Sequence, residues 1–110
     1  MRDIGFEQQV EIFERHPGPV LESADVRRDP EGMLRKLCTT IGISFDPAML
    51  SWAEGPKRFD GVWASHWYDA VHRSTGFAGP EGPLPEVEGE AAELVDVSLP
   101  FYQRLAVEAL

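Results

Sequence analysis

The sequence has one cysteine, no long apolar run and nearly twice as many acidic as basic residues. Because no run reaches about 18 apolar residues, we expect no membrane-spanning helix. Cys38 lies within an apolar pattern, so we expect a buried thiol in a reducing compartment, and hence a cytoplasmic protein, rather than a nucleophile. Met1 leads directly into a helical pattern, so no signal peptide is expected.

Basic residues are scarce, since 10 of them stand against 19 acidic residues and leave a net charge of −9. This balance argues against nucleic acid and anionic membranes as general partners. The basic residues nevertheless occur in adjacent pairs, which could hold a small anion or simply be solvated near helix ends. The pairs are Arg27 with Arg28, Arg35 with Lys36, and Lys57 with Arg58.

The motifs of common catalytic and metal sites are also missing. The chain has no GxxxxGK(S/T) loop, no GxSxG elbow, no HExxH and no CxxC. His66 and His72 are six residues apart, about 240° around a helix, so they do not share a face. We therefore predict no metal site, and we expect His66 to be a packed side chain with one hydrogen bond. The residue types alone identify no catalytic residue.

A capped helix pair in residues 29–52 is the clearest structural pattern. Asp29 before Pro30, and Asp46 before Pro47, are typical of an N-cap followed by proline at the first helical position. Gly42 is placed to end the first helix in a left-handed conformation. We predict a helix over residues 30–41, a short connector, and a second short helix that ends near residue 52. The first helix carries apolar residues at helical spacing, namely Met33, Leu34, Leu37, Cys38 and Ile41.

Two more helices are predicted from apolar spacings of three and four. Residues 4–15 form the first, with Asp3 as its cap. Residues 62–73 form the second, and its apolar stripe includes Trp63 and Trp67. Each tryptophan would cover about 200 Å² if buried, so this stripe is expected to dominate burial.

The remaining segments are less regular. Val20–Ser23 is predicted as one short strand, and no second strand is apparent, so either this segment is merely extended or its sheet partners lie outside this chain. Residues 78–90 are rich in proline, glycine and glutamate, which is typical of a mobile loop. The last helix, over residues 91–110, contains Pro100, so we expect a kink or a restart there, with Ser98 able to cap.

The loop KRFDGVW, which runs from Lys57 to Trp63, is the best candidate for a binding site. Lys57 and Arg58 are adjacent cations, Gly61 lets backbone approach a ligand, and a predicted helix follows directly. Cations, free N–H groups and a helix dipole together favour phosphate or sulfate. The alternative is a turn with exposed basic tips.

These segments resemble the C-terminal half of bacterial sulfotransferase-family proteins, which are similar to enzymes that transfer sulfuryl groups from 3′-phosphoadenosine 5′-phosphosulfate (PAPS). The resemblance covers nearly the whole chain, from Gly5 to Leu105. It rests on the segments VLESADVRRDPEGMLRKLCTTIGISFDPAMLSW, GPKRFDGVWASHWYDAVHRSTGF and LPFYQRL. The family has a strand followed by an acidic residue, which correspond here to Val20–Ser23 and Asp25. It then has an Asp-Pro helix start, a leucine-rich helix and a glycine connector. These correspond to Asp29-Pro30, to Leu34 with Leu37, and to Gly42-Ile43.

The resemblance implies a binding role for the basic loop. In the family, a basic, glycine-containing loop that ends in Gly-x-Trp closes over the 3′-phosphate of the donor. Lys57, Arg58, Gly61 and Trp63 match that loop loosely, and Ala64 stands where the family has a lysine. The resemblance therefore implies that these four residues contact PAPS.

Other parts of the family pattern are missing from this sequence. It contains neither the strand–loop–helix that binds the phosphosulfate, nor the upstream arginine and serine that hold the 3′-phosphate, nor the general base. The resemblance therefore implies a fragment without its nucleotide-binding core, with weak or no PAPS binding and no turnover alone. The unpaired strand would belong to a parallel sheet in the parent fold.

Together these patterns predict a single partial domain over residues 1–110, mainly α, with four to five helices and one short strand near Val20–Ser23. Such an architecture is equivalent to the C-terminal part of an α/β, P-loop-like sulfotransferase fold. The functional hypothesis is sulfuryl transfer by the parent protein from PAPS to a hydroxyl or amine of a small-molecule acceptor, without a metal. The alternative is a non-catalytic helical protein-interaction module, whose uncovered apolar faces would favour self-association.

Overall fold

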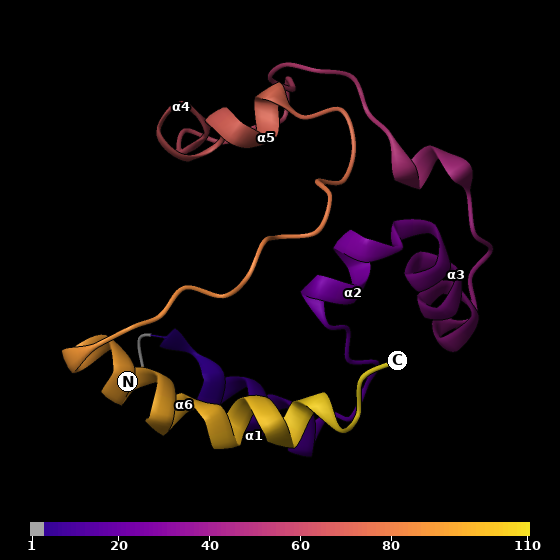
Figure 1. Cartoon of the computed structure of the whole chain (residues 1–110). Coiled ribbons are helices and arrows are strands. Elements are labelled where there is room, and N and C mark those ends of the chain that lie inside the picture. Colours follow the sequence, from indigo (N-terminus) through magenta and orange to yellow (C-terminus); the bar gives the residue numbers. More distant parts are fainter. Residues whose placement is uncertain (1–3) are drawn as a thin grey trace.

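The computed structural model describes residues 4–110, and these are mainly helical, as the sequence predicted. Asp3, the expected cap of the first helix, lies outside the described residues. Figure 1 shows separate groups of helices joined by long connections. The helices are α1 (Phe6–Arg15), α2 (Ser23–Arg28), α3 (Pro30–Ile41), the 3-10 helix η2 (Pro47–Leu50), α4 (Ala64–Trp67), α5 (Asp69–Arg73) and α6 (Gly89–Ala106).

The capped helix pair is confirmed. The Asp29 carboxylate accepts a hydrogen bond of 3.0 Å from the Gly32 N–H at the start of α3, a contact of a kind that contributes about 1 kcal/mol. Gly42 ends α3 with φ 77°, a conformation that favours glycine. Asp46 accepts a bond of 2.8 Å from the Ala48 N–H, so it caps η2 in the same way. The second helix is a single 3-10 turn that ends at Leu50.

The predicted strand at Val20–Ser23 is wrong beyond its first residue. Val20 forms one parallel bridge with Ala109, and the Leu110 N–H donates to the Val20 carbonyl at 3.0 Å. Ser23 begins α2, because the next residues close hydrogen bonds back onto the Glu22 carbonyl. The segment before α2 is therefore merely extended, and its bridge partner lies within this chain.

The predicted helix over residues 62–73 is interrupted at Tyr68 and forms α4 and α5. The predicted burial of its tryptophans is wrong, since Trp63 is 66% exposed and Trp67 is 74% exposed. His66 is also exposed, contrary to its expected packing. The reason is that no helix of residues 4–110 other than its neighbour packs against α4 or α5 (Figure 1).

Helix α6 begins at Gly89, two residues earlier than predicted, so residues 89–90 belong to this helix and not to the preceding loop. It continues through Pro100 without a restart, and Ser98 lies buried inside it rather than at a cap. Pro100 lies on the exposed side of α6, so water can reach the carbonyl that loses its helical hydrogen bond there, and α6 packs against α1. The Arg104 guanidinium lies 5.4 Å from the centre of the Phe13 ring at this contact.

The chain exposes more surface than a compact protein of its size. Its radius of gyration is 16.6 Å, whereas about 13 Å is typical of a domain of this length. Its accessible surface is 8644 Å², compared with about 6,100 Å² expected for a compact monomer. The buried apolar side chains of the described residues are few and belong to different helix groups, namely Val10, Met33, Cys38 and Ala64.

The helices of residues 4–110 include none with both the length and the apolar character needed to cross a membrane.

Candidate functional site

The predicted binding residues lie in a loop closed on itself, which spans residues 51–77 and is called here the 51–77 loop. Its two ends run side by side: Ser51 forms an antiparallel bridge with Gly76, and the Trp52 N–H donates to the Thr75 carbonyl at 2.9 Å. This pairing holds the ends of the loop together and presents α4 and α5 beyond them (Figure 1).

The side chain of Trp52 strengthens this closure. Its indole Nε1–H donates to the Ser74 hydroxyl at 2.9 Å, and its ring forms a T-shaped pair with the ring of Phe77, with centres 5.5 Å apart. An aromatic pair of this geometry adds about 0.5–1.5 kcal/mol beyond its buried area. This aromatic pair therefore anchors the chain on both sides of residues 57–60, which carry Lys57 and Arg58 and are called here the basic turn.

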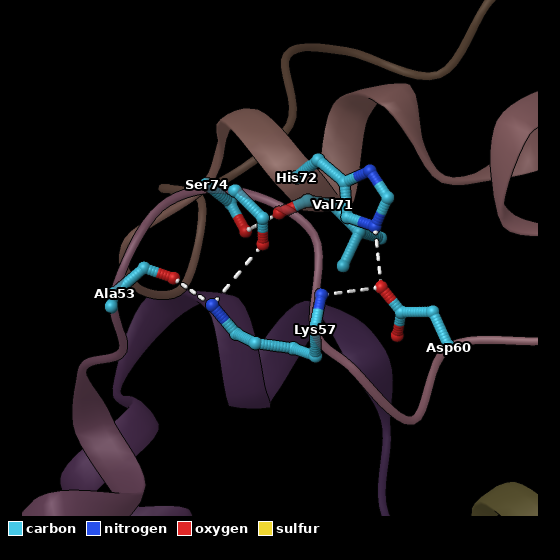
Figure 2. A network of polar contacts seen from close by, with 7 residues as sticks. Ala53, Lys57, Asp60, Val71, His72 and Ser74 are labelled. Atoms are coloured by element: carbon cyan, nitrogen blue, oxygen red, sulfur yellow. Dashed lines mark hydrogen bonds and ion pairs between the residues drawn. The ribbon is translucent and has the colours of Figure 1, made fainter.

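Lys57 turns its ammonium group toward the loop itself (Figure 2). Its Nζ donates to the Ala53 carbonyl at 2.5 Å and to the Gly55 carbonyl at 3.1 Å. An ammonium group has three N–H donors, so these two carbonyls leave one for a ligand. Lys57 thus contributes first to the shape of the loop and offers only part of its donor capacity outward.

Asp60 joins the basic turn to α5. Its Oδ2 accepts the Lys57 backbone N–H at 2.7 Å and lies 2.9 Å from the Nε2 of His72 (Figure 2). Both side chains are mostly shielded, since Asp60 is 17% exposed and His72 is 20% exposed. The Gly55 N–H also donates to the His72 carbonyl at 2.7 Å. The loop is therefore joined to α5 by a main-chain hydrogen bond as well as by the Asp60 side chain.

The hydrogen bond from the Lys57 N–H lowers the pKa of Asp60 below its ordinary value of 3.8. Burial opposes this lowering. The hydrogen bond from His72, together with the charges of His72 and Lys57, lowers the pKa further. A carboxylate with a depressed pKa stabilises the fold above its unfolded pKa, and this stability is lost as the pH falls through the folded pKa. The Asp60 contacts therefore hold at neutral pH and open in acid.

Arg58, Gly61 and Trp63 face outward from this framework. Arg58 is exposed and has no hydrogen-bond or ion-pair partner among residues 4–110. A Cβ added at Gly61 would meet no atom within 4 Å, so the space beside its backbone is open. Trp63 precedes α4, which has only four residues, so few peptide dipoles are aligned along this helix. The expected contribution of a helix dipole is therefore small.

The basic pairs around the central helix are mostly paired with acidic side chains. Arg27 binds Glu81 and the Gly79 carbonyl, and Arg28 lies 2.7 Å from Asp25. Arg35 lies 2.8 Å from Glu31 and above the ring of Phe45. Lys36 is exposed but far along the sequence from the 51–77 loop. In each of the other two pairs, at least one cation forms an ion pair with a carboxylate. Among the described residues, Lys57 and Arg58 are thus the one adjacent pair in which neither cation forms an ion pair with a carboxylate.

A cavity of about 580 Å³ lies apart from this loop, between α2, residues 80–84 and Tyr102 of α6. The Tyr102 hydroxyl donates to Glu22 at 2.6 Å, and this bond raises the pKa of Tyr102 above 10.0. Arg27 and Arg28, which also line the cavity, are already engaged by acidic side chains. The described residues that line this cavity therefore offer no free cation for a phosphate.

Asp60 and His72 were missed by sequence reasoning as members of the site. They are 12 residues apart, and only the closure of the 51–77 loop brings them together. The available signal was the position of Asp60 beside Gly61, since aspartate commonly binds backbone N–H groups in turns. In residues 4–110, no group of three or more histidine, cysteine or carboxylate side chains is arranged to hold a metal ion.

Comparison with known proteins gives one family match and several similar relatives whose names differ from it. A family model described as a sulfotransferase domain matches residues 1–109. The chain is 42% identical over 89 residues to branched-chain-amino-acid aminotransferase-like protein 1 of Arabidopsis thaliana, and 37% identical over 89 residues to protein 2 of the same name and organism. Each match covers 81% of this chain and 16% of the relative, so the chain spans about a sixth of the length of these relatives.

A third relative is the catalase-peroxidase of Streptomyces reticuli, which is 32% identical over 82 residues. That match covers 59% of this chain and 11% of the relative. No solved structure matches the chain.

Proposed function

This chain belongs to the sulfotransferase domain family, and from that premise we propose that it is the C-terminal part of a PAPS-dependent sulfotransferase. In this proposal the parent protein transfers a sulfuryl group from PAPS to a hydroxyl or amine of a small molecule. This chain binds the 3′-phosphate end of the donor through Lys57, Arg58, Gly61 and Trp63. The free, buried thiol of Cys38 supports a reducing location such as the cytoplasm.

The observation that carries this proposal is the guanidinium of Arg58, which has no partner among residues 4–110 and lies on a turn with fixed ends. The turn is anchored by Lys57, whose backbone and side chain both bind within the loop. Arginine presents its donors in a planar fork that suits two phosphate oxygens, and such charge-assisted bonds are about twice as strong as neutral ones. A basic group on an otherwise acidic chain is thus left available where the family motif lies.

Gly61 and Trp63 support the same role. The open space beside Gly61 leaves room for a phosphate to approach the backbone closely. The exposed indole of Trp63 offers a face on which an adenine ring could stack, a contact worth about 1–3 kcal/mol per base in nucleic-acid complexes. Together with one remaining donor on Lys57, these groups fit a phosphorylated nucleoside.

The proposal includes no turnover by these 110 residues alone. In-line sulfuryl transfer needs a clamped donor and a positioned nucleophile, because catalysis of this kind is mostly positioning and charge stabilisation. The β-bridges of residues 4–110 are two isolated pairs, which provide no sheet edge for a phosphosulfate-binding loop. We therefore place the donor clamp and the base in other parts of the parent protein.

Calorimetric titration with adenosine 3′,5′-bisphosphate tests this function. We expect weak, saturable binding that becomes about tenfold weaker in Arg58→Ala, because a charge-assisted phosphate contact is removed. Arg15→Ala is the matched control: it removes the same charge from an exposed arginine on α1, and its affinity should match that of the unmodified chain. Equal affinities for Arg58→Ala and the unmodified chain would contradict the assignment.

A non-catalytic helical interaction module is the second candidate. It is favoured by the exposed apolar surface, which includes Phe59, Val62, Trp63, Trp67 and Val71 on one loop. The excess surface of the chain is about 2,500 Å², which is the size of a permanent protein–protein interface. In this case the apolar faces would pair with a second copy or another protein, and the titration would show no saturable binding.

A further inference from the structure

The turn that carries Arg58 is closed in both directions. The Asp60 N–H donates to the Lys57 carbonyl at 3.0 Å, and the Lys57 N–H donates back to the Asp60 carboxylate at 2.7 Å. Arg58 and Phe59 lie between these two bonds, so the backbone that carries the guanidinium is fixed at both ends. Such a closed turn reduces the conformational freedom that a ligand would otherwise have to remove.

The closed turn is attached to α5 through the same carboxylate oxygen. The Oδ2 of Asp60 lies 2.9 Å from the Nε2 of His72 (Figure 2). An ionised carboxylate only accepts hydrogen bonds, so the Nε2 of His72 is the donor. The Tyr68 ring forms a T-shaped pair with the His72 imidazole, with ring centres 5.9 Å apart, and this contact restricts the imidazole. Asp60 therefore connects the turn to a helix whose histidine is itself held.

We propose that Asp60 and His72 are positioning residues, which hold the turn over residues 57–60 so that Arg58 meets the phosphate in a preset orientation. This inference rests on the proposed function for its ligand, although the connection itself does not. Neither residue needs to touch the phosphate. Their contribution is to hold the backbone of the turn, in the way that supporting hydrogen bonds orient a binding group.

Charge alone predicts the opposite effect of Asp60. A carboxylate near a phosphate repels it, so removing the charge should tighten binding if Asp60 has no positioning role. Asparagine and alanine separate the two cases. The asparagine carbonyl can accept both hydrogen bonds without the negative charge, whereas alanine loses the bonds and the charge together.

The test compares Asp60→Ala, Asp60→Asn and His72→Ala by calorimetric titration with adenosine 3′,5′-bisphosphate. Asp60→Ala is expected to bind about tenfold more weakly and His72→Ala about threefold more weakly, because supporting hydrogen bonds to a charged group are lost. Asp60→Asn should remain within about threefold of the unmodified chain, because it can replace both bonds. His66→Ala is the matched control, since His66 is an exposed histidine on the neighbouring helix α4. An Asp60→Ala chain that binds as tightly as the unmodified chain, or more tightly, overturns the proposal.

A measurement without ligand keeps this inference separate from the proposed function. Hydrogen exchange of the Lys57 amide should become about tenfold faster in Asp60→Ala and stay unchanged in Asp60→Asn, because the first variant alone loses the acceptor. Unchanged amide signals from α1 and α6 would show that the rest of the chain keeps its fold. If the bisphosphate fails to bind, the proposed function fails, and the Lys57 amide still decides whether Asp60 holds the turn. An unchanged exchange rate in Asp60→Ala overturns the connection.

Discussion

Replacing Met33 with alanine is expected to lower the free energy of unfolding of the α2–α3 pair by about 2–5 kcal/mol, the range measured for buried methionine truncations. Met33 is 6% exposed on α3, the helix that packs against both α2 and η2. Few other side chains in this part of the chain are as buried, so little remains to compensate for the cavity. We expect α2 and α3 to unfold, as measured by hydrogen exchange of their amides.

Ile43→Ala is the matched control for this prediction. Ile43 lies just beyond α3 but is 52% exposed, and truncating it should cost less than about 1 kcal/mol. The α1–α6 pair should keep its protection in both variants, because it packs separately from α2 and α3. Loss of protection along the whole chain in Met33→Ala would show that the helix groups unfold as one, contrary to this account.

Incubating the chain with PAPS and a panel of small alcohols and amines is expected to yield no sulfated product above that of a heat-treated sample. The reason is that positioning supplies about 7–11 kcal/mol of the barrier in favourable cases, and this chain positions at most one end of the donor. Chromatography coupled to mass spectrometry would detect the sulfated acceptor.

The same assay distinguishes a weak enzyme from a binding fragment. Product that accumulates with the unmodified chain and falls in Arg58→Ala would show that these residues hold a complete catalytic site. That outcome would overturn the proposal that the donor clamp and the base lie elsewhere in the parent protein.

Local signals in the sequence predicted local structure well. The Asp29 cap, Pro30 and the left-handed Gly42 act over a few residues, and they fix the bounds of α3. The helix break at Tyr68 was not predicted, because the apolar spacing of residues 62–73 does not show where a helix is interrupted. At Pro100 the sequence left a kink or a restart open, and the structure has no restart. The prediction for Trp63 is wrong because an apolar stripe indicates only a tendency to be buried, whereas burial itself needs a partner surface.

The candidate site was predicted in part. The adjacent cations Lys57 and Arg58 and the following glycine identified the turn, but their individual surroundings could not be foreseen. Lys57 binds carbonyls of its own loop, while Arg58 is left unpaired among the described residues. The link between Asp60 and His72 depends on loop closure, which spacing along the chain does not encode.

The central claim is that the loop over residues 57–63 binds a nucleoside 3′-phosphate. An amide NMR titration tests it most directly, by comparing adenosine 3′-monophosphate with adenosine 5′-monophosphate. The account predicts chemical-shift changes that gather at residues 57–63 and are clearly larger for the 3′-phosphate. Equal changes with both nucleotides, changes confined to α1 and α6, or no changes at all would contradict it.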